Sequence, residues 1–207
     1  MALIRILRLY LILGKRFNLW VSPIFTLFIY IILRIIIALS RIIDYLFFWT
    51  LREPLKNPII IVGNPRSGTT FLHRFLIEQN IGVGSQLWQM LYPSLFIQKC
   101  IKPFLPILEK VSPARHHSTK AHKTSLTSIE TDDVSLFFRY LDGFFMYGFF
   151  LTFDDEDLFH WVDPKLRDTS QRDFKWFESL WSRNIIANQG ERYIGKLFSL
   201  SSNLSIF

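Results

Sequence analysis

The sequence predicts an α/β protein in which a parallel sheet lies between layers of helices, with a membrane-associated helix before the folded domain. Residues 59–62 are a purely β-branched run bounded by Pro58 and Gly63, which is typical of a strand buried on both faces in a parallel sheet. A glycine-containing loop follows this run, and then apolar residues recur at helical spacing. Residues 17–40 are almost entirely apolar, which is typical of a membrane segment.

The first 52 residues are expected to anchor the chain in a membrane. Residues 17–33 contain no charged side chain, Arg34 interrupts the run, and residues 35–40 continue it. A helix over residues 17–40 is about 36 Å long, which is enough to cross a bilayer core of about 30 Å. We therefore expect a transmembrane helix at the N-terminal end of the chain.

A helix lying flat in the membrane interface is the alternative. Arg34, Arg41 and Asp44 share one helix face, as the polar residues of such a helix would. A cleaved signal peptide is disfavoured, because the apolar region is too long and lacks a clear small-residue cleavage site. Basic residues flank the segment almost equally at its two ends, so the side of the membrane that holds the domain stays undecided.

The net charge of +7 is concentrated in residues 1–58, which hold eight Lys and Arg against two acidic residues. A nucleic-acid-binding protein normally carries a basic face on its folded domain, so no nucleic-acid partner is expected, and a membrane surface fits the charge better. Half of the residues are hydrophobic, which excludes a disordered chain. The single cysteine, Cys100, excludes an internal disulfide.

Two prolines in residues 53–58 end any helix and mark a linker, so the α/β domain is assigned to residues 59–207. Within this domain, five apolar residues recur at helical spacing and are expected in the core: Phe174, Phe177, Leu180, Trp181 and Ile185.

Residues 63–70 read G-N-P-R-S-G-T-T and link the predicted strand to a helix marked by Phe71, Leu72, Phe75 and Leu76. A strand followed by such a loop and a helix is typical of a phosphate-binding site, because the loop amides and the positive end of the helix dipole converge on one point. The nucleotide triphosphatase loop G-x-x-x-x-G-K-[ST] matches at both glycines and the final threonine. Its lysine position holds Thr69, however, and the cationic residue is Arg66, so we expect a different kind of phosphate cradle.

Residues 58–76, PIIIVGNPRSGTTFLHRFL, closely resemble the 5′-phosphosulfate loop of sulfotransferases that use 3′-phosphoadenosine 5′-phosphosulfate (PAPS), in the branch that reads P-R-S-G-T-T. The resemblance implies a three-layer, P-loop-like fold and transfer of a sulfonate from PAPS to an acceptor hydroxyl or amine. It also implies which residues hold the 5′-phosphate and sulfonate: Arg66, Ser67, Gly68, Thr69 and Thr70.

The transfer needs a general base to take the acceptor's proton. Residues 86–94 resemble a family segment with an acidic residue, but Gln89 stands there and cannot act as a base. The stretches around His122 and Glu130 resemble the family's H-K and P-x-E-D-E patterns, which makes both residues candidates for the base. The alternative for Glu130 is a capping box with Thr127, in which case Asp132 and Asp133 would only favour the helix dipole.

No metal ion is expected to bind this chain. His116, His117 and His122 lack the spacing of a helix-face pair and have no matching cysteine ligands. Residues 154–157 are acidic but lack the alternating ligands and the central glycine of a calcium loop, so we expect a solvated turn.

The family resemblance covers residues 58–207, and residues 192–196 resemble the family's next strand. The family then supplies another strand and an R-D-P segment that binds the 3′-phosphate, neither of which this sequence contains. We therefore expect an incomplete sheet, either in a fragment of a longer enzyme or in a chain that no longer transfers sulfonate. Two other functions stay open: a non-catalytic membrane-associated interaction protein, or a nucleotide-binding kinase or ATPase. The acceptor, whether lipid, carbohydrate or another small molecule, is undecided.

Overall fold

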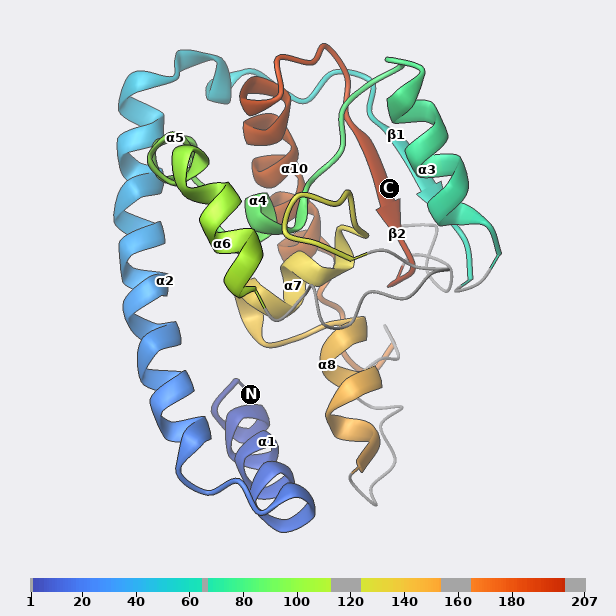
Figure 1. The fold of residues 1–207 in the computed structure, drawn as a ribbon. Helices are drawn as coiled ribbons and strands as arrows, with labels where there is room; N and C mark the ends of the chain where they lie inside the picture. Colours follow the sequence, from blue (N-terminus) through green and yellow to red (C-terminus); the bar gives the residue numbers. More distant parts are fainter. Residues whose placement is uncertain (1, 65–66, 113–123, 154–164, 200–207) are drawn as a thin grey trace.

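The computed structural model describes residues 2–64, 67–112, 124–153 and 165–199. Most of the elements are helical, and two short strands form the sheet (Figure 1). In chain order the elements are α1 (Ala2–Phe17), α2 (Ser22–Phe47), η1 (Trp49–Arg52), β1 (Ile59–Val62), α3 (Thr69–Glu78), α4 (Leu87–Leu91), α5 (Leu95–Ile101), η2 (Lys102–Phe104), α6 (Leu105–Val111), α7 (Asp133–Tyr140), α8 (Phe144–Phe149), η4 (Leu151–Phe153), α10 (Ser170–Ala187) and β2 (Ile194–Leu197).

The sheet consists of β1 and β2, which run parallel with Ile59 opposite Ile194 and Val62 opposite Leu197. The predicted strand over residues 59–62 and its parallel pairing are confirmed. Burial on both faces holds for β2, which is buried throughout, but in β1 only Ile61 is buried. Within the described residues, β1 has no second neighbouring strand, and its outer edge is not covered by the sheet.

Two helices flank this sheet, α3 on one side and α10 on the other (Figure 1). The described part of the chain is thus a helix-rich mixed structure with a small parallel sheet. The larger sheet of a P-loop-like fold is not seen in it.

The main core lies between α10, α7, α4 and β2. Trp181 stacks on Phe177 at a centroid distance of 5.4 Å and on Tyr193 at 4.9 Å. Burial of Phe177, Leu180 and Trp181 is as the sequence predicts, but Phe174 is 42% exposed. The buried face of α10 is rotated towards Trp176, whose indole N–H donates to Ser135 Oγ at 2.9 Å, and this turns Phe174 outward.

Helix α3 presents an unexpected face to the sheet. Thr69 and His73, four residues apart, are its buried residues, whereas Phe71 is 77% exposed. Leu72 and Phe75 are exposed as well, so the apolar stripe that predicts this helix faces away from the sheet. Thr69 and His73 are the residues of α3 buried against the strands, and within the described residues the sheet has no further strand against which the apolar stripe could pack.

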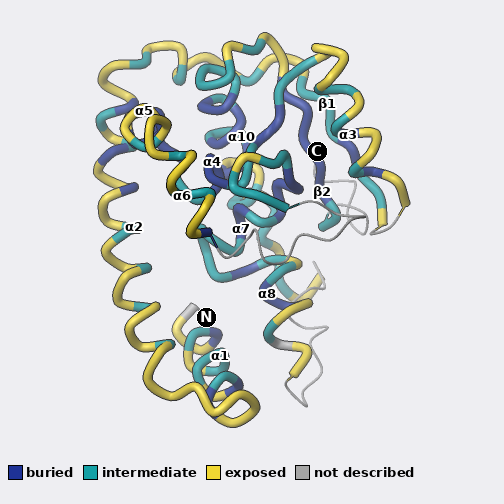
Figure 2. The backbone as a smooth tube through the Cα atoms, viewed as in Figure 1, coloured by how far each residue is buried: buried dark blue, intermediate teal, exposed yellow. Residues whose placement is uncertain are grey.

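Helix α2 is the one described helix long and apolar enough to cross a membrane, a property that it shares with signal sequences. It runs along one side of the molecule and exposes its outer face along its length (Figures 1 and 2). Asp44, near its end, is fully buried: its carboxylate accepts hydrogen bonds from Leu95 N at 3.0 Å, Phe96 N at 2.9 Å and Arg183 Nε at 2.9 Å. These contacts integrate α2 into the folded domain.

Candidate functional site

The loop between β1 and α3 lies at the carboxyl end of the parallel strands, where α/β proteins bind their ligands. A Cβ at Gly63 would lie 2.8 Å from Thr69 Cγ2, so this close approach of the loop to the helix requires glycine. Gly68 precedes the helix with φ of 82°, a left-handed conformation that glycine adopts without strain. Ser67 and Gly68 are exposed, so this part of the loop is open to solvent.

The first turn of α3 faces a lysine from the neighbouring strand. Lys196 of β2 is 2% exposed, and its Nζ donates to Thr70 Oγ1 at 2.9 Å. Burial lowers the pKa of Lys196, while Glu130 is the first of the charges that raise it. An ammonium carries three donors. Among the described residues Nζ hydrogen-bonds to Thr70 alone, and it lies 5.0 Å from the ring centre of Phe198.

Glu130 joins the same cluster through Arg74. Arg74 follows Thr70 by one helical turn, and its guanidinium lies 3.6 Å from Glu130 Oε1. Ser128 Oγ also donates to Glu130 Oε1, at 2.8 Å. The capping-box alternative for Glu130 is wrong, because α7 begins at Asp133 and its preceding residue, Asp132, makes no side-chain cap.

Ser67 and Gln89, which the sequence also places at or near the predicted site, make other contacts than those of the Lys196–Thr70 cluster. The hydroxyl of Ser67 donates to Asn64 O at 2.6 Å and so stabilises the loop itself. Gln89 is 1% exposed, and its side chain accepts from Gln86 N in a capping box at the start of α4. Arg66, His122 and the acidic residues 154–157 lie outside the described residues.

Asp132 and Asp133 accept hydrogen bonds that hold β2 in position. The sequence predicts for them only a favourable interaction with the helix dipole, so this role is additional. The carboxylate of Asp132 accepts from Lys196 N at 2.9 Å, Tyr193 OH at 2.5 Å and Trp181 Nε1 at 3.2 Å. Asp133 accepts from the backbone of the two residues after β2, at 2.6 Å and 3.3 Å. Together these bonds fix the backbone from which the Lys196 side chain extends.

His73 lies directly behind the loop and is fully buried. Its Nε2 is 2.8 Å from the carbonyl of Ile194, which can only accept, so the proton is on Nε2. Nδ1 has no hydrogen-bond partner among the described residues. Burial lowers the pKa of His73 to about 4.

The stability of the fold should therefore depend on His73 between about pH 6.5 and pH 4. In this window the unfolded chain binds a proton that the folded chain does not, so stability falls as pH falls, by up to about 3 kcal/mol. Asp132 opposes this trend: burial raises its pKa to about 6, and its contribution is lost as pH rises from 3.8 to 6.

Urea unfolding of the wild type and of His73→Gln at pH 7 and pH 4 separates the two contributions. The wild type should lose more stability than the variant on acidification, and equal losses would contradict a neutral buried histidine. The Asp132→Asn variant is a second control. It removes the titrating carboxyl that opposes the effect of His73, so this variant should lose more stability than the wild type on acidification.

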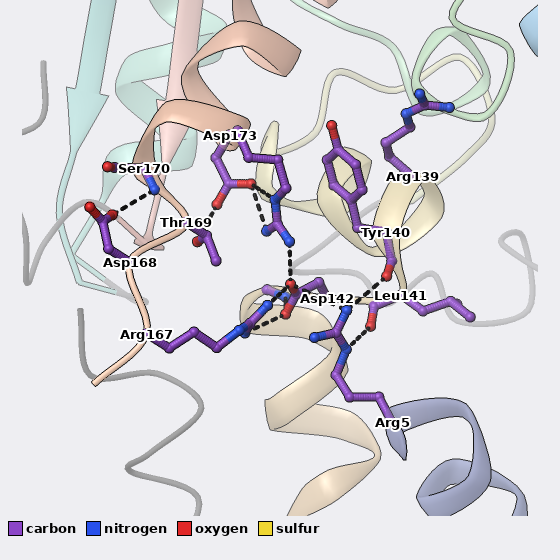
Figure 3. A network of polar contacts seen from close by, with 12 residues as sticks. Arg5, Arg139, Tyr140, Leu141, Asp142, Arg167, Asp168, Thr169, Ser170 and Asp173 are labelled. Carbon is purple, nitrogen blue, oxygen red and sulfur yellow. Dashed lines mark hydrogen bonds and ion pairs between the residues drawn. The ribbon is translucent and has the colours of Figure 1, made fainter. Parts of the chain in front are cut away.

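A second polar cluster surrounds Asp142, which is 1% exposed (Figure 3). Its carboxylate accepts from the guanidinium of Arg167, from Arg172 Nη1 at 2.7 Å and from the hydroxyl of Tyr147. Arg5 Nη2 lies 3.5 Å away and brings α1 into the cluster. Burial alone would raise the pKa of Asp142, but the hydrogen bonds from Arg167, Tyr147 and Arg172 outweigh it and lower the pKa.

The pocket beside this cluster has a volume of about 550 Å³ and is lined in part by Arg5, Arg167 and Arg172. Three carboxylates balance these cations: Asp142 at the centre, Asp168 in the lining, and Asp173, which pairs with Arg172 at 2.7 Å. The cluster has no excess charge for an anionic ligand, and we interpret it as a structural connection between α1 and the segment that leads into α10.

Within the part of the chain that the structure describes, no group of three or more His, Cys, Asp or Glu side chains could hold a metal ion. No family model, curated protein or solved structure matches this chain.

Proposed function

We propose that this chain is the PAPS-binding part of a membrane-anchored sulfotransferase. The observation that supports this most strongly is the Lys196–Thr70 contact at the first turn of α3. It adds a buried ammonium to a glycine-containing loop and a helix N-terminus, and all three features favour an anion. The motif resemblance supplies the identity of that anion, the 5′-phosphosulfate of PAPS.

In this proposal the cation, the hydroxyls and the helix amides stabilise charge that develops on the leaving phosphate. As the acceptor oxygen or nitrogen attacks sulfur, the bond from sulfur to the phosphate oxygen breaks and that oxygen becomes more negative. In the described part of the chain we assign this stabilisation to Lys196 and Thr70, and Arg66 is the cation of the loop itself. Glu130 or His122 would take the acceptor's proton.

Binding of adenosine 3′,5′-bisphosphate, the product that PAPS leaves behind, tests this proposal. Purified wild-type chain in detergent should show a raised melting temperature when the nucleotide is added, because a ligand that binds only the folded state stabilises it. Lys196→Ala should weaken binding by about tenfold or more, since it removes a charge-assisted hydrogen bond. Arg66→Ala should weaken it as well.

Lys99→Ala is the matched control, because Lys99 is an exposed lysine on α5 and should leave nucleotide binding unchanged. If no variant changes binding, or if the wild type binds nothing, the proposal fails. Tight binding of ATP with magnesium in place of the bisphosphate would favour a kinase or ATPase. Absence of binding to either would favour a non-catalytic interaction protein.

Membrane anchoring is the second part of the proposal. It is supported by the length and apolarity of α2 and by the basic residues on both sides of it. A cleaved signal sequence fits poorly, because removing α2 would leave the buried Arg183 without the carboxylate of Asp44. The chain should float with phospholipid vesicles in a density gradient, and recovery of all the protein in the lipid-free fraction would contradict anchoring.

A further inference from the structure

The charged side chains of α2, together with Tyr30 and Ser40, lie on the face that contacts the folded domain, whereas Ser22, Thr26 and Tyr45 are exposed. Tyr30 OH donates to Phe138 O at 3.0 Å, and Arg41 Nη2 donates to Ser179 Oγ at 2.6 Å. The guanidinium of Arg41 also lies 4.8 Å above the ring of Trp176. Together with the buried Asp44, these contacts attach α2 to the domain from residue 30 to residue 44.

The outward face of the same helix is apolar over its whole length. Its three charged residues, Arg34, Arg41 and Asp44, are half-buried or buried on the domain side, so the exposed positions carry no charge. Exposed side chains on this face include Phe25, Phe28, Ile32, Ile35, Leu39 and Leu46. The polarity is the reverse of a surface helix in a water-soluble protein, which turns its apolar side towards the core.

A helix attached in this way cannot cross a bilayer. Residues 17–29 precede the first domain contact of α2, and as a helix they would reach about 20 Å against a hydrocarbon core of about 30 Å. Crossing with the remaining turns would carry the attached domain, with its buried charges, into the lipid. A helix lying in the membrane plane does not need to span the 30 Å core, and it does not carry the domain into the lipid, because only its outward face enters the hydrocarbon.

Exposed cations lie near both ends of the apolar face. Lys15 lies before α2, and Arg52 follows it, with its guanidinium 3.6 Å above the ring of the exposed Trp49. Lys99 lies on α5, which packs against α2, with its ammonium 4.8 Å from the ring of Phe48. Basic groups of this kind are attracted to anionic lipid headgroups, and tryptophan favours the interface.

We infer that α2 is a monotopic anchor, which lies in the membrane plane with its outward face in one leaflet of an anionic phospholipid bilayer. The inference rests on the proposed membrane anchoring and specifies its geometry. It places both ends of α2, and the phosphate-binding loop, on the same side of the membrane.

Single cysteines at the two ends of α2 test this geometry. The full chain with Cys100→Ser, which removes the native exposed thiol, receives either Lys15→Cys or Lys56→Cys, both exposed positions. Each protein is added to preformed sealed vesicles of phosphatidylcholine and phosphatidylglycerol, recovered by flotation, and labelled with a membrane-impermeant maleimide before and after detergent. We expect both cysteines to be labelled fully before detergent is added.

The other outcomes are distinguishable. If one of the two cysteines is labelled only after detergent, α2 crosses the bilayer, and the in-plane geometry is wrong while anchoring stands. If neither protein floats, anchoring itself fails and the inference fails with it. A chain that stays with the lipid-free fraction as a dimer would show that a second copy covers this face.

Substitutions on the outward face provide an independent test. Ile32→Asp should lower the fraction of protein that floats by tenfold or more, because a carboxylate would replace an apolar side chain in the hydrocarbon. Ile81→Asp is the matched control: Ile81 lies outside α2 and is 43% exposed, as is Ile32, and its replacement should leave flotation unchanged. Equal loss in both variants would exclude α2 as the lipid-binding surface. Omitting phosphatidylglycerol should also lower binding, and binding that does not depend on it would contradict an anionic leaflet.

Discussion

The Asp44→Ala variant should lose about 4 kcal/mol of its free energy of unfolding, one of the largest effects expected for any single substitution in this chain. Asp44 is fully buried, and its partner Arg183 has a side chain only 1% exposed. Removing the carboxylate leaves a buried guanidinium without its counter-charge. It also leaves the amide groups of Leu95 and Phe96, at the start of α5, without an acceptor.

Urea unfolding in detergent, followed by tryptophan fluorescence, measures this loss. Asp44→Asn should fall between the wild type and the alanine variant, because an amide oxygen still accepts a hydrogen bond but carries no charge. Glu53→Ala is the control: this carboxylate is 56% exposed and pairs with Lys56 at 3.5 Å, so its removal should change stability by less than about 0.5 kcal/mol. An Asp44→Ala chain as stable as the control would show that α2 is not integrated into the domain.

The second large effect is expected at Asp142. Asp142→Ala removes the carboxylate shared by Arg5, Arg167 and Arg172, and should cost about 3 kcal/mol or more, because three cations are left close together around a buried site. Since the folded state lowers the pKa of Asp142, its contribution is present above about pH 4 and is lost as pH falls below that value.

A double-mutant cycle shows whether this cluster holds α1 in place. If Arg5 and Asp142 interact in the folded state, the loss in Arg5→Ala with Asp142→Ala should be smaller than the sum of the two single losses. Additive losses would mean that the Arg5–Asp142 ion pair does not hold α1, which would leave the hydrogen bonds from Arg5 to the carbonyls of Tyr140 and Leu141 and the apolar contacts. Asp168→Ala, which removes an exposed carboxylate of the same pocket and its hydrogen bond from Ser170 N, should cost less than Asp142→Ala.

Local patterns in the sequence predict the strand at residues 59–62 and the helix after the loop, because each depends on neighbouring residues. The purely β-branched composition of the strand also indicates a parallel sheet, although its partner β2 lies far along the chain. Local patterns also predict three of the six buried positions in α10, namely Phe177, Leu180 and Trp181. In α3 the apolar spacing correctly predicts the helix but does not coincide with its buried face. The direction in which a helix faces is decided by the surface available to it, and the two-stranded sheet accepts Thr69 and His73 instead.

The polar contacts of the candidate site could not be predicted in the same way. Lys196 and Thr70 are 126 residues apart. The resemblance of residues 192–196 to the family's next strand predicts a strand there, but the residues near Lys196 do not show that its side chain reaches Thr70. Asp132 and Asp133 read as ordinary residues at a helix start, and only the folded chain shows that they accept hydrogen bonds from β2 and the segment after it. For α2, the sequence does indicate the orientation of the helix. Arg34, Arg41 and Asp44 share one helix face, and that face is turned towards the domain.

The contact between Asp44 and Arg183 also has a consequence for the order in which the protein assembles. The two residues are 139 positions apart, so α2 leaves the ribosome long before its arginine is synthesised. At about 5–20 residues per second, this interval lasts several seconds or more, while a helix forms within about a microsecond. The apolar helix therefore meets its surroundings first, and β2, which carries Lys196, is synthesised afterwards. Translation thus completes α2 before it reaches Lys196, the lysine that contacts Thr70 at the start of α3.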